Sequence, residues 1–172
     1  VLPNVGRESH TYLHHIIENY DNLTDIVYFT QANPFDHAPH FESAVESNIG
    51  LCRPYQGLSN VTATVYNFNV SQYEHAFPGI QDGFTKVVRE LFGADFEKPV
   101  IWFYPGAIMA VHKELIQRRP IDFYRKCLKL LDYTVDPIEG YAFERLWALI
   151  FDDSGMNWPP KSSFSEESPE SS

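Results

Sequence analysis

The residues best suited to chemistry lie near the N-terminal end of the chain, beginning with Arg7 and Glu8. These two side chains stand next to each other just before an apolar pattern with helical spacing. A guanidinium group can bind a phosphate or a carboxylate through two parallel hydrogen bonds. Arg7 could therefore contact a phosphate, or it could form an ion pair with Glu8 that fixes the local turn. Both interpretations stay open, and Arg7 and Glu8 are kept as candidate substrate-binding residues.

A second polar group follows the apolar segment 25–30 and contains Gln31, Asn33, Asp36 and His37. In open α/β sheets, ligands bind beyond the carboxyl ends of strands, so this loop is a candidate binding site. Asp36 and His37 could hold a divalent cation or orient the hydroxyl groups of a sugar. The alternative is a hydrogen-bonded turn after Pro34, with His37 in solvent.

Two further features could take part in chemistry. His10 and His14 stand four residues apart on the predicted first helix, a spacing that suits two metal ligands. No third ligand is fixed by the sequence, so hydrogen bonding along the edge of a cleft is the favoured role, and His14 is a candidate substrate-binding residue. Glu144 could act as a general base or could pair with the neighbouring Arg145.

The elements that must position these residues follow from hydrophobic periodicity. Gly6 permits a tight turn, and apolar residues then recur at helical spacing up to Tyr20. We predict helices at 7–20, 41–49, 82–92, 113–119, 120–131 and 137–151, and strands at 25–30, 61–66, 100–104 and 107–111. This order predicts a single α/β domain over residues 1–158, with a mixed central sheet flanked by helices. Residues 159–172 are rich in Ser, Pro and Glu and predict a disordered tail.

Composition excludes several classes of partner. The formal net charge is −10, which argues against nucleic acid or an anionic membrane surface as a partner. No apolar run approaches the ~18 residues of a membrane span. The chain begins with Val1 and is interpreted as a fragment or a processed chain. The sequence does not fix its compartment, although three glycosylation triplets, at Asn22, Asn60 and Asn69, would suit a Golgi-like secretory location if an anchor lies upstream.

Several segments together resemble a known family. They are Asn4-Val-Gly-Arg-Glu-Ser-His-Thr-Tyr-Leu, His15-Ile-Ile-Glu-Asn-Tyr-Asp-Asn-Leu, Asn33-Pro-Phe-Asp-His, Gly106-Ala-Ile-Met-Ala-Val, Arg119-Pro-Ile-Asp-Phe-Tyr and Glu144-Arg-Leu-Trp. They resemble domain-of-unknown-function family 3431, a group of uncharacterised proteins found in fungi and bacteria. The resemblance covers residues 2–151. The family has an additional amino-terminal strand that is missing here, in agreement with the fragment interpretation.

The family is distantly similar to glycosyltransferases of the GT-A type, and this similarity implies a function. It implies transfer of a sugar from a nucleotide-sugar donor to a glycan or another hydroxyl acceptor. It also implies a manganese or magnesium ion, held here by Asp36 and His37 because the chain has no Asp-x-Asp motif. Gly106 would lie near the acceptor, and Glu144 would be the catalytic base.

Two other functions are kept as alternatives. One is a non-catalytic carbohydrate-binding or interaction protein on the same fold, favoured by the missing Asp-x-Asp motif and by an aromatic content of 15%. The other is a metal-dependent hydrolase that uses His10, His14 and His37.

Overall fold

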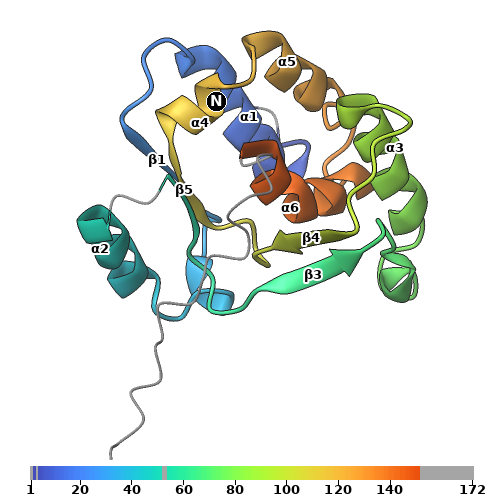
Figure 1. Cartoon of the computed structure of the whole chain (residues 1–172), viewed down its shortest axis with the longest axis horizontal. Helices are drawn as coiled ribbons and strands as arrows, with labels where there is room; N and C mark the ends of the chain where they lie inside the picture. The colour runs from blue at the N-terminus through green and yellow to red at the C-terminus, as the bar shows by residue number, and fades with distance from the viewer. Residues whose placement is uncertain (1, 3, 52–53, 152–172) are drawn as a thin grey trace, which may run out of the picture.

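The secondary structure of the chain follows its apolar periodicity in a computed structural model, which describes residue 2 and residues 4–51 and 54–151 (Figure 1). All six predicted helices and all four predicted strands are present, with ends shifted by a few residues. The elements, in chain order, are α1 (Arg7–Asn19), β1 (Ile26–Phe29), the 3-10 turn η1 (Pro34–Asp36), α2 (Phe41–Leu51), β2 (Tyr55–Gly57), β3 (Ala63–Tyr66), the 3-10 turn η2 (Ser71–Tyr73), α3 (Ile80–Phe92), β4 (Val100–Phe103), β5 (Met109–His112), α4 (Lys113–Gln117), α5 (Ile121–Lys129) and α6 (Ile138–Phe151).

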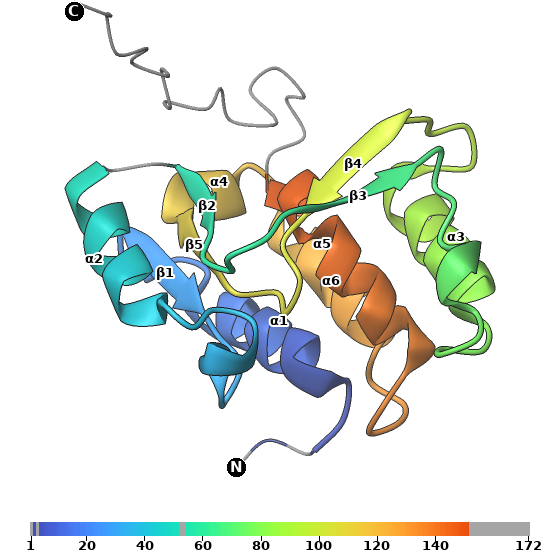
Figure 2. The ribbon, with the colours of Figure 1, turned by 90° about the horizontal axis from the view of Figure 1, so that it is seen from below.

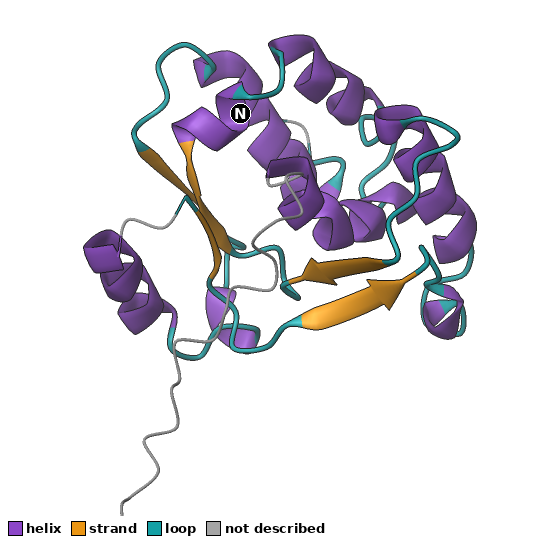
Figure 3. Cartoon of the chain, in the orientation of Figure 1, coloured by secondary structure: helices purple, strands orange, loops and turns teal. Residues whose placement is uncertain are grey.

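The strands form two small antiparallel sheets, and this corrects the prediction of one mixed central sheet (Figure 3). In the first sheet, β5 lies between β1 and β2, with Val111 opposite both Val27 and Tyr55. In the second sheet, β3 pairs with β4, and Val65 lies opposite Ile101. The chain is therefore an α/β domain in which every described strand pair is antiparallel.

The separation into two sheets follows from the turn between β4 and β5. Gly106 and Ala107 both adopt left-handed backbone conformations, with φ values of 85° and 52°. Two such residues in succession redirect the chain sharply. As a result, β4 and β5 are consecutive in sequence but belong to different sheets. The sequence predicted separate strands at 100–104 and 107–111, but not the consequence of the turn between them for strand pairing.

The main hydrophobic core surrounds α6, which lies in the middle of the fold with α1, α3, α5 and β4 around it (Figures 1 and 2). Eleven of the fourteen residues of α6 are buried. The largest fully buried core side chains include Leu13, Ile16, Phe84, Tyr124, Phe143, Trp147 and Phe151. The candidate site described below lies at the edge of this core, where the first turns of α1 approach α6.

A second, smaller core lies on the other face of the β1–β5–β2 sheet. Helix α2 covers this face and stands away from α6 in both views (Figures 1 and 2). The fully buried members of this core are Ala38, Leu58, Ile108 and Ala110. The described residues thus form one small domain, while the predicted tail at 159–172 lies outside them.

Candidate functional site

A cavity at the N-terminal side of the domain coincides with the predicted polar residues. It has a volume of about 620 Å³ and lies between the start of α1 and the loop that follows β1. Five sequence-predicted residues line it: Arg7, Glu8, Gln31, Asn33 and Asp36. The remaining lining residues are Asn4, Thr11, Tyr12, Thr30 and Ala32. The cavity combines one cation, two carboxylates, three side-chain amides and three hydroxyl groups.

The backbone at the start of α1 fixes one wall of the cavity. Gly6 and Arg7 both have left-handed conformations, with φ values of 70° and 58°. A Cβ on Gly6 would lie 2.5 Å from the Cβ of His10, so only glycine fits this position. Left-handed backbone at a residue other than glycine costs free energy, and such residues often occur at functional sites. The tight turn places both Arg7 and Glu8 at the edge of the cavity.

The guanidinium of Arg7 lies between α1 and α6 and is half-buried. Its Nη1 is 3.2 Å from Oδ1 of Asp136, and its Nε is 3.5 Å from Oε2 of Glu8. Its Cζ lies 4.1 Å from the ring centroid of Tyr141. The predicted ion pair with Glu8 is therefore present. Because the same guanidinium borders the cavity, a phosphate contact remains a proposal.

The loop after β1 forms the opposite wall. Asn33 donates from Nδ2 to Oδ2 of Asp36 over 3.2 Å, and the His37 amide donates to the carbonyl of Pro34. These bonds close the 3-10 turn η1, which corresponds to the turn interpretation of this loop. Asp36 and Asn33 still line the cavity, so the turn holds their polar groups at its edge.

His37, Gly106 and Glu144 form a group of their own next to the cavity. The Gly106 amide donates to Oε1 of Glu144 over 2.8 Å. A Cβ on Gly106 would lie 2.9 Å from the Cβ, Cγ and Cδ2 of His37, so the imidazole packs directly on this glycine. Three predicted residues from distant parts of the sequence thus lie together, but none of the three is among the residues that line the cavity.

Glu8 connects this group to the cavity. Burial raises the pKa of the Glu8 carboxyl, and the nearby charge of Glu144 raises it further, against the opposing effects of its own backbone amide and of Arg7. Glu144 itself also faces Arg145, whose Nη1 is 3.4 Å from Oε2 of Glu144. The carboxylate of Glu144, on α6, is therefore close enough to influence the ionisation of Glu8, on α1.

The histidines of α1 lie elsewhere. His10 is buried, and its Nε2 is 3.4 Å from Oδ1 of Asp132, which lies between α5 and α6. His14 is half-buried, and although it follows Arg7 and Thr11 at helical spacing it is not among the residues that line the cavity. Among the described residues, no three His, Cys, Asp or Glu side chains are arranged to hold a metal ion.

The sequence analysis missed three lining residues that carry hydroxyl groups: Thr11, Tyr12 and Thr30. Thr11 stands four residues after Arg7 and three after Glu8, so helical spacing could have placed it beside them. Tyr12 belongs to the apolar face of the helix predicted at 7–20, where its ring does pack, 5.0 Å from the ring of Phe29. Only the structure shows that Tyr12 also lines the cavity.

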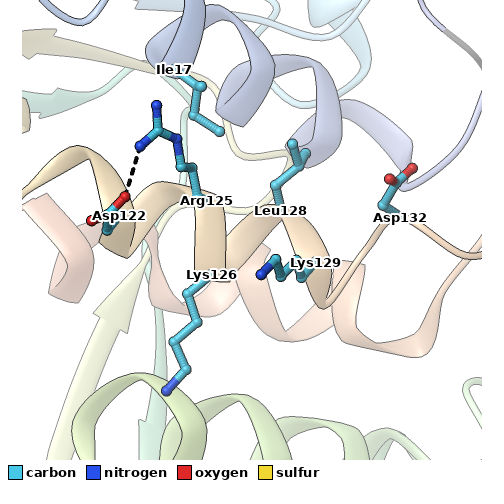
Figure 4. Close-up of a pocket in the computed structure, with 7 residues that line it drawn as sticks. All are labelled: Ile17, Asp122, Arg125, Lys126, Leu128, Lys129 and Asp132. Carbon is cyan, nitrogen blue, oxygen red and sulfur yellow. Dashed lines mark hydrogen bonds and ion pairs between the residues drawn. The ribbon is translucent and has the colours of Figure 1, made fainter.

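A second cavity is smaller and lies between α1 and α5 (Figure 4). It has a volume of about 420 Å³ and contains none of the predicted site residues. Arg125 pairs with Asp122 over 2.7 Å, and Lys126 points towards α3, where it pairs with Glu90 over 3.3 Å. Because these charges are neutralised locally, this surface lacks a set of polar groups directed at one point.

The family of the chain is established by its sequence. The chain belongs to the family described as "Protein of unknown function (DUF3431)", whose model matches residues 1–165. The resemblance to domain-of-unknown-function family 3431 is thus confirmed. No curated protein and no solved structure shows significant similarity to the chain. Within the described residues, no helix has the length and apolar character needed to cross a membrane.

Proposed function

We propose that the protein is a glycosyltransferase of GT-A-like type that transfers a sugar from a nucleotide-sugar donor to a hydroxyl acceptor. The observation that carries this proposal is the convergence of Arg7, Glu8, Gln31, Asn33 and Asp36 on one cavity. Sugars are bound by carboxylates and amides that exchange several hydrogen bonds with neighbouring hydroxyl groups. A diphosphate is bound by arginine, and the same cavity supplies both kinds of group.

Arg7 is the donor-binding residue in this proposal. Its guanidinium is already oriented by Asp136 and by the Tyr141 ring, so it is presented to a phosphate in a fixed geometry. Gln31, Asn33 and Asp36 would hydrogen-bond to the hydroxyls of the donor sugar from the opposite wall. His14 would contribute at the outer end of α1, if the donor extends that far.

A divalent cation, manganese or magnesium, fits only as an ion shared with the donor. Asp36 would be its protein ligand, with the Asn33 amide beside it, and His37 would contribute if its ring left Gly106. The described residues offer no set of three protein ligands, so phosphate oxygens would have to complete the shell. Once bound, the cation would neutralise charge on the diphosphate.

The acceptor would approach from the side of Gly106. The left-handed turn at Gly106 is held by Glu144 and covered by His37, so the three residues form a defined border. A carboxylate would receive the proton of the acceptor hydroxyl, and Glu144 is the candidate that the sequence resemblance implies.

The proposal is tested by calorimetric titration with UDP-glucose, UDP-N-acetylglucosamine and GDP-mannose, each with and without manganese. We expect one of them to bind, and we expect Arg7→Lys to weaken that binding roughly tenfold because a bidentate contact is lost. Arg125→Lys is the matched control, since Arg125 is also paired with an aspartate but lies at the second cavity. If no nucleotide sugar binds in either condition, the proposed function is wrong.

A non-catalytic carbohydrate-binding or interaction protein is the second candidate. It is favoured by the absence of an Asp-x-Asp motif from the sequence. Binding of a free glycan, with no affinity for any nucleotide sugar, would support this candidate instead.

A further inference from the structure

Two carboxylates meet near the cavity, and the structure gives them different surroundings. Glu8 lines the cavity, whereas Glu144 does not. Oε1 of Glu144 accepts the Gly106 amide over 2.8 Å, and Oε2 faces Arg145 over 3.4 Å. Both oxygens of Glu144 are thus occupied by the protein itself.

Arg145, the partner of Oε2 of Glu144, is itself held in place by several contacts. Arg145 is 5% exposed, and its guanidinium lies between the rings of Tyr73 and Phe103, at 4.7 and 5.2 Å from their centroids. Its Nη1 also donates to the Tyr141 carbonyl over 2.7 Å. A buried cation held in this way fixes the position of the neighbouring carboxylate. These contacts suit Glu144 to hold the Gly106 turn.

Glu8 differs from Glu144 in its place rather than in its exposure. Its side chain pairs with Arg7 at 3.5 Å and is 16% exposed, close to the 19% of Glu144, but it lines the cavity. Tyr12, one turn further along α1, also lines this cavity, and its hydroxyl is buried with no hydrogen-bond partner among the described residues.

We infer that, if the protein transfers sugars as proposed above, Glu8 is the catalytic base and Glu144 is a positioning residue. The acceptor oxygen would give its proton to a Glu8 carboxylate oxygen while its lone pair forms the new bond to the anomeric carbon. The bond from that carbon to the diphosphate oxygen would break, and its electron pair would leave with the diphosphate beside Arg7. The proton on Glu8 would then pass to solvent, which restores the carboxylate.

The surroundings of Glu8 support this role chemically. A general base works best when its pKa lies near the working pH. Burial and the charge of Glu144 raise the pKa of Glu8, while its own backbone amide and Arg7 oppose the shift. Glu144 would thus act on the reaction in two ways: it would fix the Gly106 turn, and it would raise the pKa of Glu8.

The first test measures release of nucleoside diphosphate from whichever of the three nucleotide sugars binds, with water or an added sugar as acceptor. We expect Glu8→Gln to lower kcat by roughly 100- to 10,000-fold with little change in donor affinity, and to remove the acidic limb of the pH–rate profile. Glu8→Asp should restore part of the rate. Glu144→Gln keeps an acceptor for the Gly106 amide and should lower kcat by no more than about tenfold. Asp122→Asn, on α5, is the carboxylate-to-amide control.

The second test does not need activity. The Glu8 carboxyl is titrated by carbon-detected NMR in the wild type and in Glu144→Gln. We expect a Glu8 pKa above the ordinary glutamate range in the wild type and a lower one in the variant. An ordinary Glu8 pKa in the wild type, or none of the expected change in the variant, would overturn the inference.

These experiments distinguish a wrong function, sugar transfer, from a wrong assignment of the catalytic base. If no nucleotide sugar binds, the proposed function is wrong whatever the titration shows. If a donor binds and is cleaved but Glu8→Gln retains its rate while Glu144→Gln loses it, sugar transfer stands and the assignment of the base is reversed.

Discussion

Gly106 is the residue at which backbone conformation and the candidate site meet. Its φ of 85° is unfavourable for other residues, and the imidazole of His37 occupies the space that a side chain at this position would need. Gly79 has the same φ of 85°, but no described atom lies within 4 Å of the place its Cβ would occupy. A substitution at Gly79 therefore tests the cost of the backbone conformation alone, whereas the same substitution at Gly106 adds a steric clash with His37.

We predict that Gly79→Ala lowers the free energy of unfolding by about 1–2 kcal/mol, the cost of left-handed backbone in an alanine. Gly106→Ala should cost more, because the new methyl group also displaces His37. Urea denaturation of both variants measures the difference. Adding His37→Ala to Gly106→Ala should recover stability; equal losses for the two glycine variants would contradict the packing described here.

Glu8 provides a prediction about pH. A carboxyl whose pKa is raised on folding binds more protons in the folded state than in the unfolded state, so stability decreases as pH rises above about 4.3, the ordinary glutamate value. Glu8→Gln removes this cost. We expect the variant to melt at a higher temperature than the wild type at pH 8, and the advantage to vanish at pH 3.5. Thermal melts across this range measure it, and a destabilised variant at pH 8 would contradict the raised pKa.

At the level of single residues, the sequence predicted much of the cavity wall and the residues His37, Gly106 and Glu144, but not the contacts among these three. Arg7, Glu8 and the Gln31–Asp36 loop were recognisable because each lies at the end of a periodic element. The contact between His37 and Gly106 could not be predicted, because the two residues are 69 positions apart and no local sequence pattern indicates such a contact. Tyr12 lies in the core, as the apolar spacing of the first helix predicts, yet it also lines the cavity.

At the level of elements, a buried network ties α3 to α6. Glu139, which is 3% exposed, accepts hydrogen bonds from Lys86 of α3 over 2.6 Å and from the Tyr133 hydroxyl. Burial opposes ionisation of Glu139, but the bonds from Lys86 and Tyr133 outweigh it and lower its pKa. The carboxylate is therefore charged at neutral pH and depends on its partners.

We predict that Lys86→Met, which keeps the aliphatic stem, costs about 1–3 kcal/mol because a buried carboxylate loses its cation. The double variant with Glu139→Gln should recover part of this loss. Since the pKa of Glu139 is lowered on folding, its stabilising effect is lost as pH falls below about 4.3. Denaturation at pH 7 and pH 3.5 measures both effects; a Lys86→Met variant as stable as the wild type at pH 7 would show that the network contributes nothing.

The pairing of the strands in the two sheets could not be predicted from the sequence. Each predicted strand exists, but alternation of side chains does not encode which strands pair. β2 was missed because three residues are too few to show a period. The pairing instead depends on the left-handed turn at Gly106 and Ala107, where the sequence predicted only the end of one strand and the start of the next.

At the level of the whole molecule, stability is distributed unevenly between the two cores. Helix α6 is buried on most sides, whereas α2 rests on the small core formed by Ala38, Leu58, Ile108 and Ala110. Local opening is easiest where few apolar contacts hold an element. The N-terminal wall of the cavity, on α1, belongs to the larger core.

We predict that amide hydrogen exchange is slowest in α6 and clearly faster in α2, with α1 close to α6. Exchange measured by mass spectrometry after pepsin digestion gives this order. Equal protection of α2 and α6 would mean that the two cores unfold as one unit.

The most direct measurement of the central claim is NMR mapping of nucleotide-sugar binding at residue resolution. When UDP-glucose, UDP-N-acetylglucosamine or GDP-mannose is added, we expect the amide signals of Arg7, Glu8, Thr11, Asn33 and Asp36 to shift together. Signals of α5 around Arg125 should not move. Shifts confined to the α5 cavity, or no shift with any of these donors with or without manganese, would contradict the assignment of this cavity as a donor site.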